Sequence, residues 1–112
     1  MALSGIGNAV SAMRAFGTAM SSTANNIANA QSQGYKKTMA VIEQAGNDQG
    51  VTVSISRDAS QGYVDDQGNE LSNVDIAREI TSTIATEAGF KANVASVRTM
   101  DEMVGSLLDI KG

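Results

Sequence analysis

Apolar and small residues recur at alternating spacings of three and four through the N-terminal part of the chain. This spacing is typical of one face of an α-helix with a seven-residue repeat, so it predicts a helix over residues 3–31. Gly17 lets a partner helix approach closely but weakens an isolated helix by about 0.5–1 kcal/mol relative to alanine. Gly34 is placed to end the helix in a left-handed cap. The repeat comprises Leu3, Ile6, Val10, Met13, Gly17, Met20, Ala24 and Ile27.

The middle of the chain has the two-residue alternation of a β-strand. Residues 51–57, VTVSISR, alternate apolar and hydroxyl side chains as a half-buried strand does. Residues 38–44, TMAVIEQ, are expected to pair with them across the turn-rich stretch AGNDQG. A second, smaller hairpin is expected around DDQGN at residues 65–69, with Tyr63 and Val64 leading into the turn.

A second long helix is predicted over residues 72–110. Ser72 is expected to be its N-cap, with Asp75 completing a capping box. The phase of the apolar positions shifts near Gly89, which predicts a bend or a change of partner there. These positions include Ile76, Ile80, Ile84, Phe90, Val94, Val97, Met100, Val104, Leu107 and Leu108.

The predicted elements indicate a mainly α fold with a small β part. We expect long N- and C-terminal helices packed antiparallel in a coiled-coil-like manner, with the β-hairpin region between them and projecting from the end where they are joined. The expected segments are 1–35, 36–71 and 72–112, and the two end helices form one helical domain. Helices about 43 and 55 Å long cannot bury all of their apolar surface against each other. The remaining stripes imply neighbouring helices in an assembly.

Composition argues against catalysis and cofactor binding. The 112 residues contain no Cys and no His, which removes disulfides, the commonest metal ligands and the usual general base at neutral pH. No nucleophile turn, P-loop or dinucleotide fingerprint is present. We therefore expect no enzyme, no catalytic residue, no cofactor and no small-molecule substrate. Asp65, Asp66, Asn69 and Glu70 place several oxygens in one turn, but their spacing departs from a calcium loop, so no metal is expected.

Charge and hydropathy argue against nucleic-acid-binding and membrane-spanning proteins. A net charge of −4 argues against nucleic acid as a partner. No run approaches the roughly 20 apolar residues needed to cross a bilayer. The start of the sequence lacks a charged region before an apolar block, so we expect no cleavable signal peptide.

Both ends of the chain resemble one family. Residues 21–38, SSTANNIANAQSQGYKKT, resemble the N-terminal signature of bacterial flagellar rod and hook proteins. Residues 72–112 are similar to the C-terminal signature of the same axial proteins, with an aromatic-x-A-N step at residues 90–93 and a T-x-D-E-M step at residues 99–103. The short middle segment resembles the layout of the proximal rod proteins, whereas the SNVD start of the C-terminal signature looks more like the distal rod and hook.

The resemblance implies a structural subunit of the flagellar basal-body rod in the periplasm. Its expected partners are copies of itself, other rod or hook proteins, and the flagellar type III export apparatus. The alternative is a small soluble helical adaptor or chaperone-like binding module that forms a fixed oligomer.

The candidate site is an assembly interface formed by the apolar repeats. Asn25, Asn26 and Asn29 flank Ile27, where side-chain amides either bridge neighbouring helices and fix their register or simply end the helix. The expected interface comprises Leu3, Ile6, Val10, Met13, Met20, Asn25, Asn26, Ile27, Asn29, Ile80, Ile84, Val94, Val97, Met100, Val104, Leu107 and Leu108.

Overall fold

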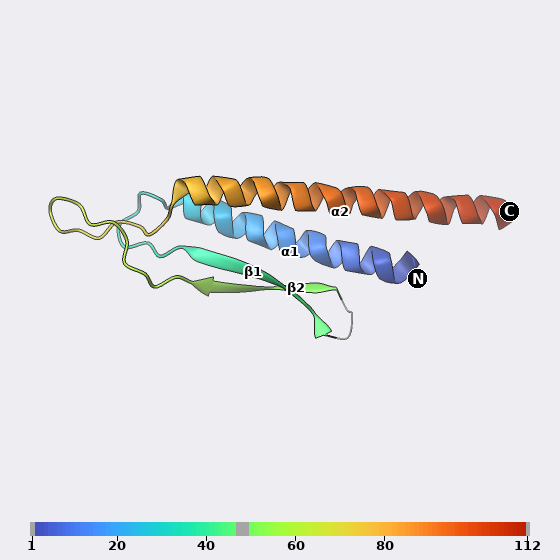
Figure 1. Ribbon diagram of the computed structural model, residues 1–112, viewed down its shortest axis with the longest axis horizontal. Helices are drawn as coiled ribbons and strands as arrows, with labels where there is room; N and C mark the ends of the chain where they lie inside the picture. The colour runs from blue at the N-terminus through green and yellow to red at the C-terminus, as the bar shows by residue number, and fades with distance from the viewer. Residues whose placement is uncertain (1, 47–49, 112) are drawn as a thin grey trace.

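Two long helices and one β-hairpin make up the protein. The computed structural model describes residues 2–46 and 50–111. In chain order the elements are α1 (Ala2–Ala28), β1 (Thr38–Gln44), β2 (Val51–Arg57) and α2 (Ile76–Lys111). Helix α1 lies between α2 and the hairpin, and the molecule is elongated, with extents of 74 × 25 × 14 Å (Figure 1). The predicted fold class, two packed helices with a hairpin between them in sequence, is confirmed.

The two helices run antiparallel, and α2 is the longer. Equal steps along α1 and α2 in opposite directions bring successive pairs of residues together. These pairs are Gly5 with Met100, Phe16 with Gly89, and Asn26 with Glu79. Helix α2 has 36 residues and α1 has 27, so the C-terminal turns of α2 extend beyond the N-terminal end of α1 (Figure 1).

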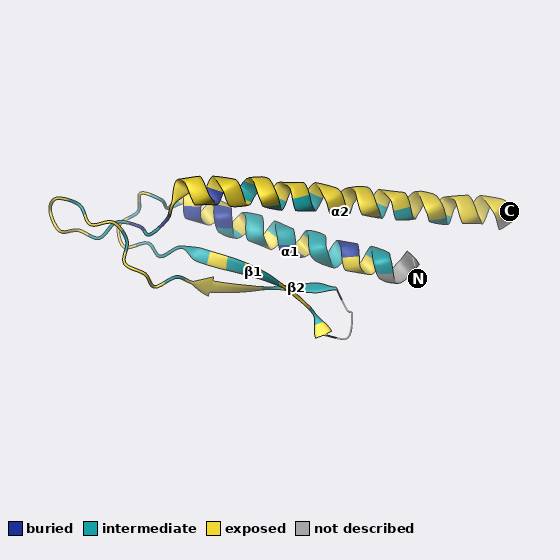
Figure 2. Ribbon diagram, viewed as in Figure 1, coloured by how far each residue is buried: buried dark blue, intermediate teal, exposed yellow. Residues whose placement is uncertain are grey.

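The core is thin and built from small side chains. Among the described residues, the buried apolar side chains are Ala9, Ala15 and Val74. Most of α2 is exposed, and burial concentrates on α1 and on the segment that leads into α2 (Figure 2). Gly89 makes room for Phe16, because a Cβ there would lie 2.7 Å from the ring. Helix α2 continues through Gly89 as one helix, so the shift in apolar phase marks this close contact and does not interrupt the helix.

The hairpin has the predicted strands but a different position. Strands β1 and β2 pair antiparallel with Thr38 opposite Arg57 and Gln44 opposite Val51, as expected. We expected the hairpin to project from the junction of the helices, and this is wrong, since it folds back along α1 (Figure 1). The Ser11 hydroxyl holds it there by donating to the Val51 carbonyl at 2.7 Å and accepting from the Val51 N–H at 3.0 Å.

Both helix boundaries next to the hairpin differ from the prediction. Helix α2 begins at Ile76 because Asp75 is the N-cap, with its Oδ1 accepting from the N–H groups of Ala77 and Arg78 at 3.1 and 3.3 Å. The Ser72 hydroxyl, expected to cap the helix, instead donates to the carbonyl of Ala30.

Helix α1 ends at Ala28, earlier than the predicted residue 31. Gly34 has a φ of 69°, but it adopts this conformation in the connecting loop and not as the helix cap. Its N–H donates to the Glu70 carbonyl at 2.9 Å, so the left-handed residue ties this loop to the one that precedes α2.

The second, smaller hairpin is present as a tight turn closed by a single bridge between Val64 and Glu70. Gly68, with a φ of 83°, provides the left-handed residue of the turn. The Leu71 N–H donates to the Tyr63 carbonyl at 2.6 Å and extends the pairing by one bond.

Alanine substitutions at two glycines test this packing. A Cβ at Gly62 would lie 2.7 Å from the backbone of Ser72, whereas a Cβ at Gly17 would have nothing within 4 Å. We expect Gly62→Ala to lower the free energy of unfolding by roughly 1–3 kcal/mol. Gly17→Ala should raise it by about 0.5–1 kcal/mol through helix propensity. Chemical denaturation followed by circular dichroism measures both, and equal effects of the two substitutions would contradict the backbone contact.

Candidate functional site

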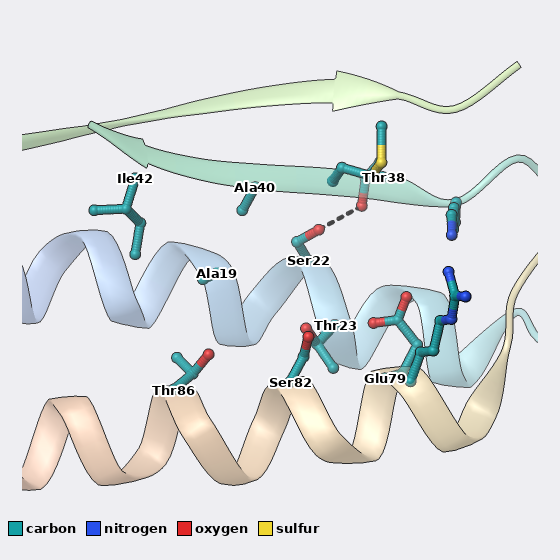
Figure 3. Close-up of a pocket in the computed structure, with 12 residues that line it drawn as sticks. Ala19, Ser22, Thr23, Thr38, Ala40, Ile42, Glu79, Ser82 and Thr86 are labelled. Atoms are coloured by element: carbon teal, nitrogen blue, oxygen red, sulfur yellow. Dashed lines mark hydrogen bonds between the residues drawn. The ribbon is translucent and has the colours of Figure 1, made fainter.

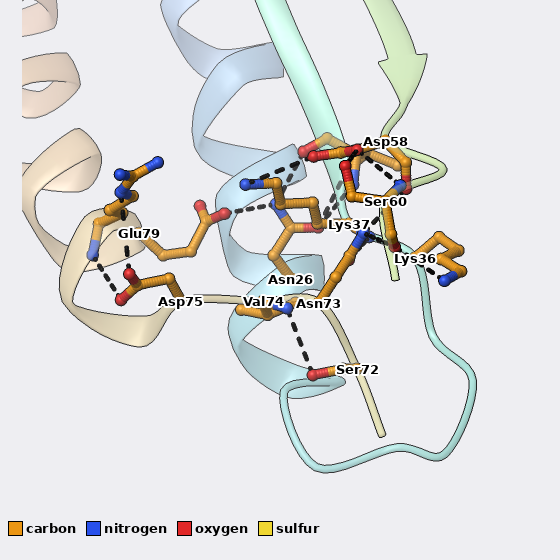
Figure 4. A network of polar contacts seen from close by, with 12 residues as sticks. Asn26, Lys36, Lys37, Asp58, Ser60, Ser72, Asn73, Val74, Asp75 and Glu79 are labelled. Carbon is orange, nitrogen blue, oxygen red and sulfur yellow. Dashed lines mark hydrogen bonds and ion pairs between the residues drawn. The ribbon is translucent and has the colours of Figure 1, made fainter. Parts of the chain in front are cut away.

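One buried amide joins both helices and the first strand at the closed end of the molecule, where the chain connects α1 to α2. The Asn26 side chain is 1% exposed, and its Nδ2 donates to the Thr38 carbonyl at 2.8 Å and to Glu79 Oε1 at 2.9 Å (Figure 4). Its Oδ1 accepts from the Tyr35 hydroxyl and from the Thr38 N–H, both at 2.9 Å. These four bonds use both donors and both acceptor positions of the amide, and the Thr38 hydroxyl makes a longer fifth bond to Oδ1 at 3.3 Å. Asn26 therefore links α1, the following loop, β1 and α2 within one subunit.

The other two asparagines of the motif have different surroundings. Asn29 bonds locally, donating to the Asn25 carbonyl at 3.0 Å and accepting from the Ser32 hydroxyl at 3.1 Å. This is the behaviour expected of a residue that ends a helix. Asn25 is exposed on α1, which leaves its side chain accessible to another molecule.

A polar pocket of about 280 Å³ lies beside this amide, between α1, β1 and α2 (Figure 3). Hydroxyl groups form much of its wall, and those of Ser22 and Thr38 are 2.6 Å apart. The Glu79 carboxylate, 9% exposed, lies against Asn26 at one end. The described residues contain no group of three or more carboxylates that would hold a metal ion. The pocket walls include Ser22, Thr23, Lys37, Thr38, Arg78, Glu79, Ser82 and Thr86.

A second polar network fixes the loop between β2 and α2. Lys36 pairs with Glu70, and Lys37 lies 3.7 Å from Asp58. Asn73 bridges the same strands of chain, because its Nδ2 donates to the Asp58 carbonyl at 2.9 Å and its Oδ1 accepts from the Lys37 N–H at 2.7 Å (Figure 4). The basic pair of the sequence thus neutralises acids of its own chain.

Hydrogen bonds to these carboxylates stabilise their charged forms. The pKa of Glu70 is lowered by the N–H of Gly62 and by Lys36. The pKa of Asp58 is lowered by hydrogen bonds from Ser60 and, to a smaller extent, by Lys37. The pKa of Asp65 is lowered mainly by the backbone N–H of Asn69. All three groups lie in the loop region, so its order is linked to their ionisation.

The predicted apolar repeat of α1 does not form the main contact with α2. A second repeat with the same spacing does, and apart from Phe16 it consists of small or polar residues. Gly5, Ala9, Phe16, Thr23 and Asn26 follow one another at intervals of three, four or seven residues and include the contacts to α2 described above. Sequence reasoning missed this repeat because it ranked positions by hydrophobicity.

The larger apolar residues of α1 lie beside this interface and remain partly open. Ile6, Val10, Met13 and Met20 are half-buried, and Ile27 is exposed. The side chain of Leu3 lies outside the described part of the structure. Ile6 and Met13 line an apolar groove of about 540 Å³ together with Val94 and Val97 of α2, and Arg98 and Asp101 stand at its rim. Residues from both predicted repeats therefore meet in one groove.

On α2 the predicted interface residues divide into two groups. Val97, Met100 and Val104 are half-buried, and Met100 contacts α1 near Gly5. The others are exposed: Ile80, Ile84, Val94, Leu107 and Leu108. No helix within the described residues is long and apolar enough to cross a membrane.

The fold and its surfaces define a class of protein, an elongated two-helix subunit whose own chain leaves large apolar side chains uncovered. Residues 60–110 match the family model of the flagellar basal body rod FlgEFG protein C-terminal region. This segment contains the loop before α2 and nearly all of α2.

Curated relatives point to the same family. The flagellar hook protein FlgE of Helicobacter pylori is 32% identical over 71 residues, which cover 63% of this chain and 10% of the relative. The flagellar hook protein FlgE of Borreliella burgdorferi is 38% identical over 42 residues, covering 38% of this chain and 10% of the relative. The chain spans about a tenth of the length of the relatives that it matches. These matches confirm the resemblance of the chain to the flagellar rod and hook axial proteins.

Replacing Asn26 tests its role at the closed end. Asn26→Ala removes all four bonds and leaves the buried Glu79 carboxylate without its amide donor. We expect the free energy of unfolding to fall by roughly 2–4 kcal/mol, since unsatisfied buried polar groups are costly. Asn25→Ala, one residue earlier and exposed, should change it by less than about 0.5 kcal/mol. Chemical denaturation of both variants makes the comparison, and a similar small effect of each would contradict the role of Asn26.

Lowering the pH should weaken the loop network. Because the folded-state pKa of Glu70 lies below its ordinary value of 4.5, its contribution to stability is complete above that pH and is lost as the pH falls through the folded value. The pKa values of Asp58 and Asp65 are likewise lowered from the ordinary 3.8, so their contributions to stability are complete above pH 3.8 and are lost as the pH falls through the folded values. Glu70→Gln should reduce the loss of free energy of unfolding at acid pH. Glu87→Gln, on the exposed surface of α2, should leave this loss unchanged. Unchanged profiles for both variants would exclude Glu70 as a contributor.

Proposed function

We propose that the chain is a structural subunit of the bacterial flagellar basal-body rod and that it assembles through its terminal helices with copies of itself and with other axial proteins. The observation that carries this proposal is the row of large apolar side chains left uncovered on both helices. These are Ile27 on α1 and Ile76, Ile80, Ile84, Leu107 and Leu108 on α2.

Burial of these residues supplies the driving force for assembly. Covering one exposed leucine or isoleucine side chain contributes about 1.5–3 kcal/mol, so a few such contacts favour association strongly. The isolated subunit gains little from its own core, which consists of alanines and one valine among the described residues. Neighbours that bind only the folded form therefore also stabilise it.

The layout between the helices favours the rod over the hook. Here α1 and α2 are joined by one hairpin and one loop, with no further strand-rich domain among the described residues. The relatives named as hook proteins are about ten times longer than the matched region. We propose a position in the periplasmic rod and export by the flagellar type III apparatus. The two end helices would form one domain that carries the hairpin.

A role in structure, without catalysis, fits a family of structural components. The competing function is an adaptor that offers one helix face to a partner and stops at a fixed oligomer. The two differ in how mass depends on concentration. Sedimentation of the purified chain over a wide concentration range should show open-ended growth for the rod subunit and a constant mass for the adaptor.

A charge placed on either helix face should block assembly. Ile27→Asp and Leu107→Asp introduce a carboxylate at exposed apolar positions, so each variant should stay folded and soluble. We expect each to reduce association at least about tenfold, equivalent to 1.4 kcal/mol or more. Gln67→Asp adds the same charge at the exposed turn before α2 and should assemble normally. Sedimentation and co-assembly with other rod proteins measure the effect. Normal incorporation of both apolar-face variants would refute the proposal.

A further inference from the structure

The C-terminal turns of α2 continue a packing surface past the end of its partner. Val97, Met100 and Val104 are half-buried, and a Cβ on Gly5 of α1 would lie 3.1 Å from Met100 Cε. The same three-and-four spacing continues to Leu107 and Leu108, which are 64% and 65% exposed. By the register of the helical pair, residues 104–111 of α2 lie beyond Ala2, where α1 begins, and we call them the overhang. Its leucines extend the face that packs on α1, and among the described residues this part of α2 lies beyond the N-terminal end of α1 (Figure 1).

The apolar groove lies at the same end of the molecule and is open to solvent. Ile6, Met13, Val94 and Val97 form its walls. Met13 follows Ser11 by two residues, so at about 100° per residue the groove opens on nearly the opposite side of α1 from the hairpin, which Ser11 holds. Nothing in the described chain covers this side of the helical pair.

We propose that the overhang of one subunit packs Leu107 and Leu108 into the apolar groove of a second copy of this chain. The proposal rests on the proposed function, since it requires self-association, and names the surfaces that meet. Two observations favour a second copy as the occupant. The overhang continues an established helix–helix interface in the same phase, and the groove of a second copy offers a cation to the one acid that follows the leucines. Arg98 and Asp101 both line the groove, and Asp109 would pair with Arg98.

The positions of the two surfaces define a stagger between parallel copies. The groove is centred on Val94 and Val97, and the leucines lie about ten to fourteen residues further along the same helix. At 1.5 Å per residue, neighbouring subunits are displaced by about 15–20 Å along the helix axis. In this parallel arrangement, the overhang of each copy binds one neighbour and its groove accepts the overhang of another, so each added copy leaves one of each free. The contact is then heterologous and allows continued growth, whereas reciprocal insertion between two antiparallel copies would close a dimer.

Cysteine cross-linking tests the contact directly, because the natural chain has no Cys. Full-length L107C and V94C chains are mixed, allowed to associate and oxidised. A disulfide needs the two Cα atoms within roughly 7 Å, so only a specific contact gives high yield. The control mixture pairs V94C with I84C, because Ile84 is also 64% exposed on α2 but lies away from the overhang. We expect on the order of tenfold more heterodimer from the first mixture.

Three further variants test the stagger and the charge pair. A chain carrying both L107C and V94C should give a ladder of covalent multimers, and a product limited to dimers would overturn the staggered arrangement. Arg98→Glu in the V94C chain should lower the cross-link yield, and Asp109→Lys in the L107C chain should restore it. Circular dichroism confirms that each variant is folded. Assembly with equal yields from test and control mixtures would refute the overhang contact and leave the rod proposal intact, whereas absence of any assembly would refute both.

Discussion

The amide of Asn26 is the interaction on which the arrangement of the other elements depends. It contacts both helices, the first strand and the loop between them through four hydrogen bonds. The apolar core is too small to set this arrangement, because alanine side chains bury little surface and tolerate sliding. A buried amide is directional, and any shift of α2 along α1 would leave it and Glu79 unpaired in a low-dielectric site. The amide thus defines the register of the helical pair as well as the position of the hairpin.

Helix α1 divides its surface between two repeats of the same spacing. The repeat made mostly of small or polar side chains includes Gly5 and allows close approach to α2. The repeat of large apolar side chains includes Ile6 and Met13 and forms one wall of an open groove. If the larger residues packed inside, the subunit would be more stable alone and would offer less surface to a neighbour. Small residues inside and large residues outside are therefore consistent with a protein whose stability is completed by assembly.

The sequence predicts the elements of this fold better than their contacts. Both strands have the expected bounds, because the alternation of residues 51–57 is a local signal that pairing along α1 does not alter. The N-cap was wrong because Ser72 finds a partner in Ala30, a residue distant in sequence. Periodicity located the apolar repeat of α1 but not the second repeat that contacts α2, since that contact depends on side-chain size and on Asn26. For the same reason, the predicted interface residues remain a prediction, although many of them lie on uncovered surface.

The two ends of the molecule differ in the kind of interaction they offer, and this difference favours directional assembly. At the closed end, polar groups are paired within the chain, through Asn26 and through ion pairs such as Lys36 with Glu70. At the open end, where the overhang of α2 extends past the described part of α1, Leu107 and Leu108 are exposed. Hydrogen bonds demand a defined geometry, whereas apolar burial depends mainly on area. A subunit built in this way keeps its internal register, and burial of its open end against another molecule stabilises the assembly.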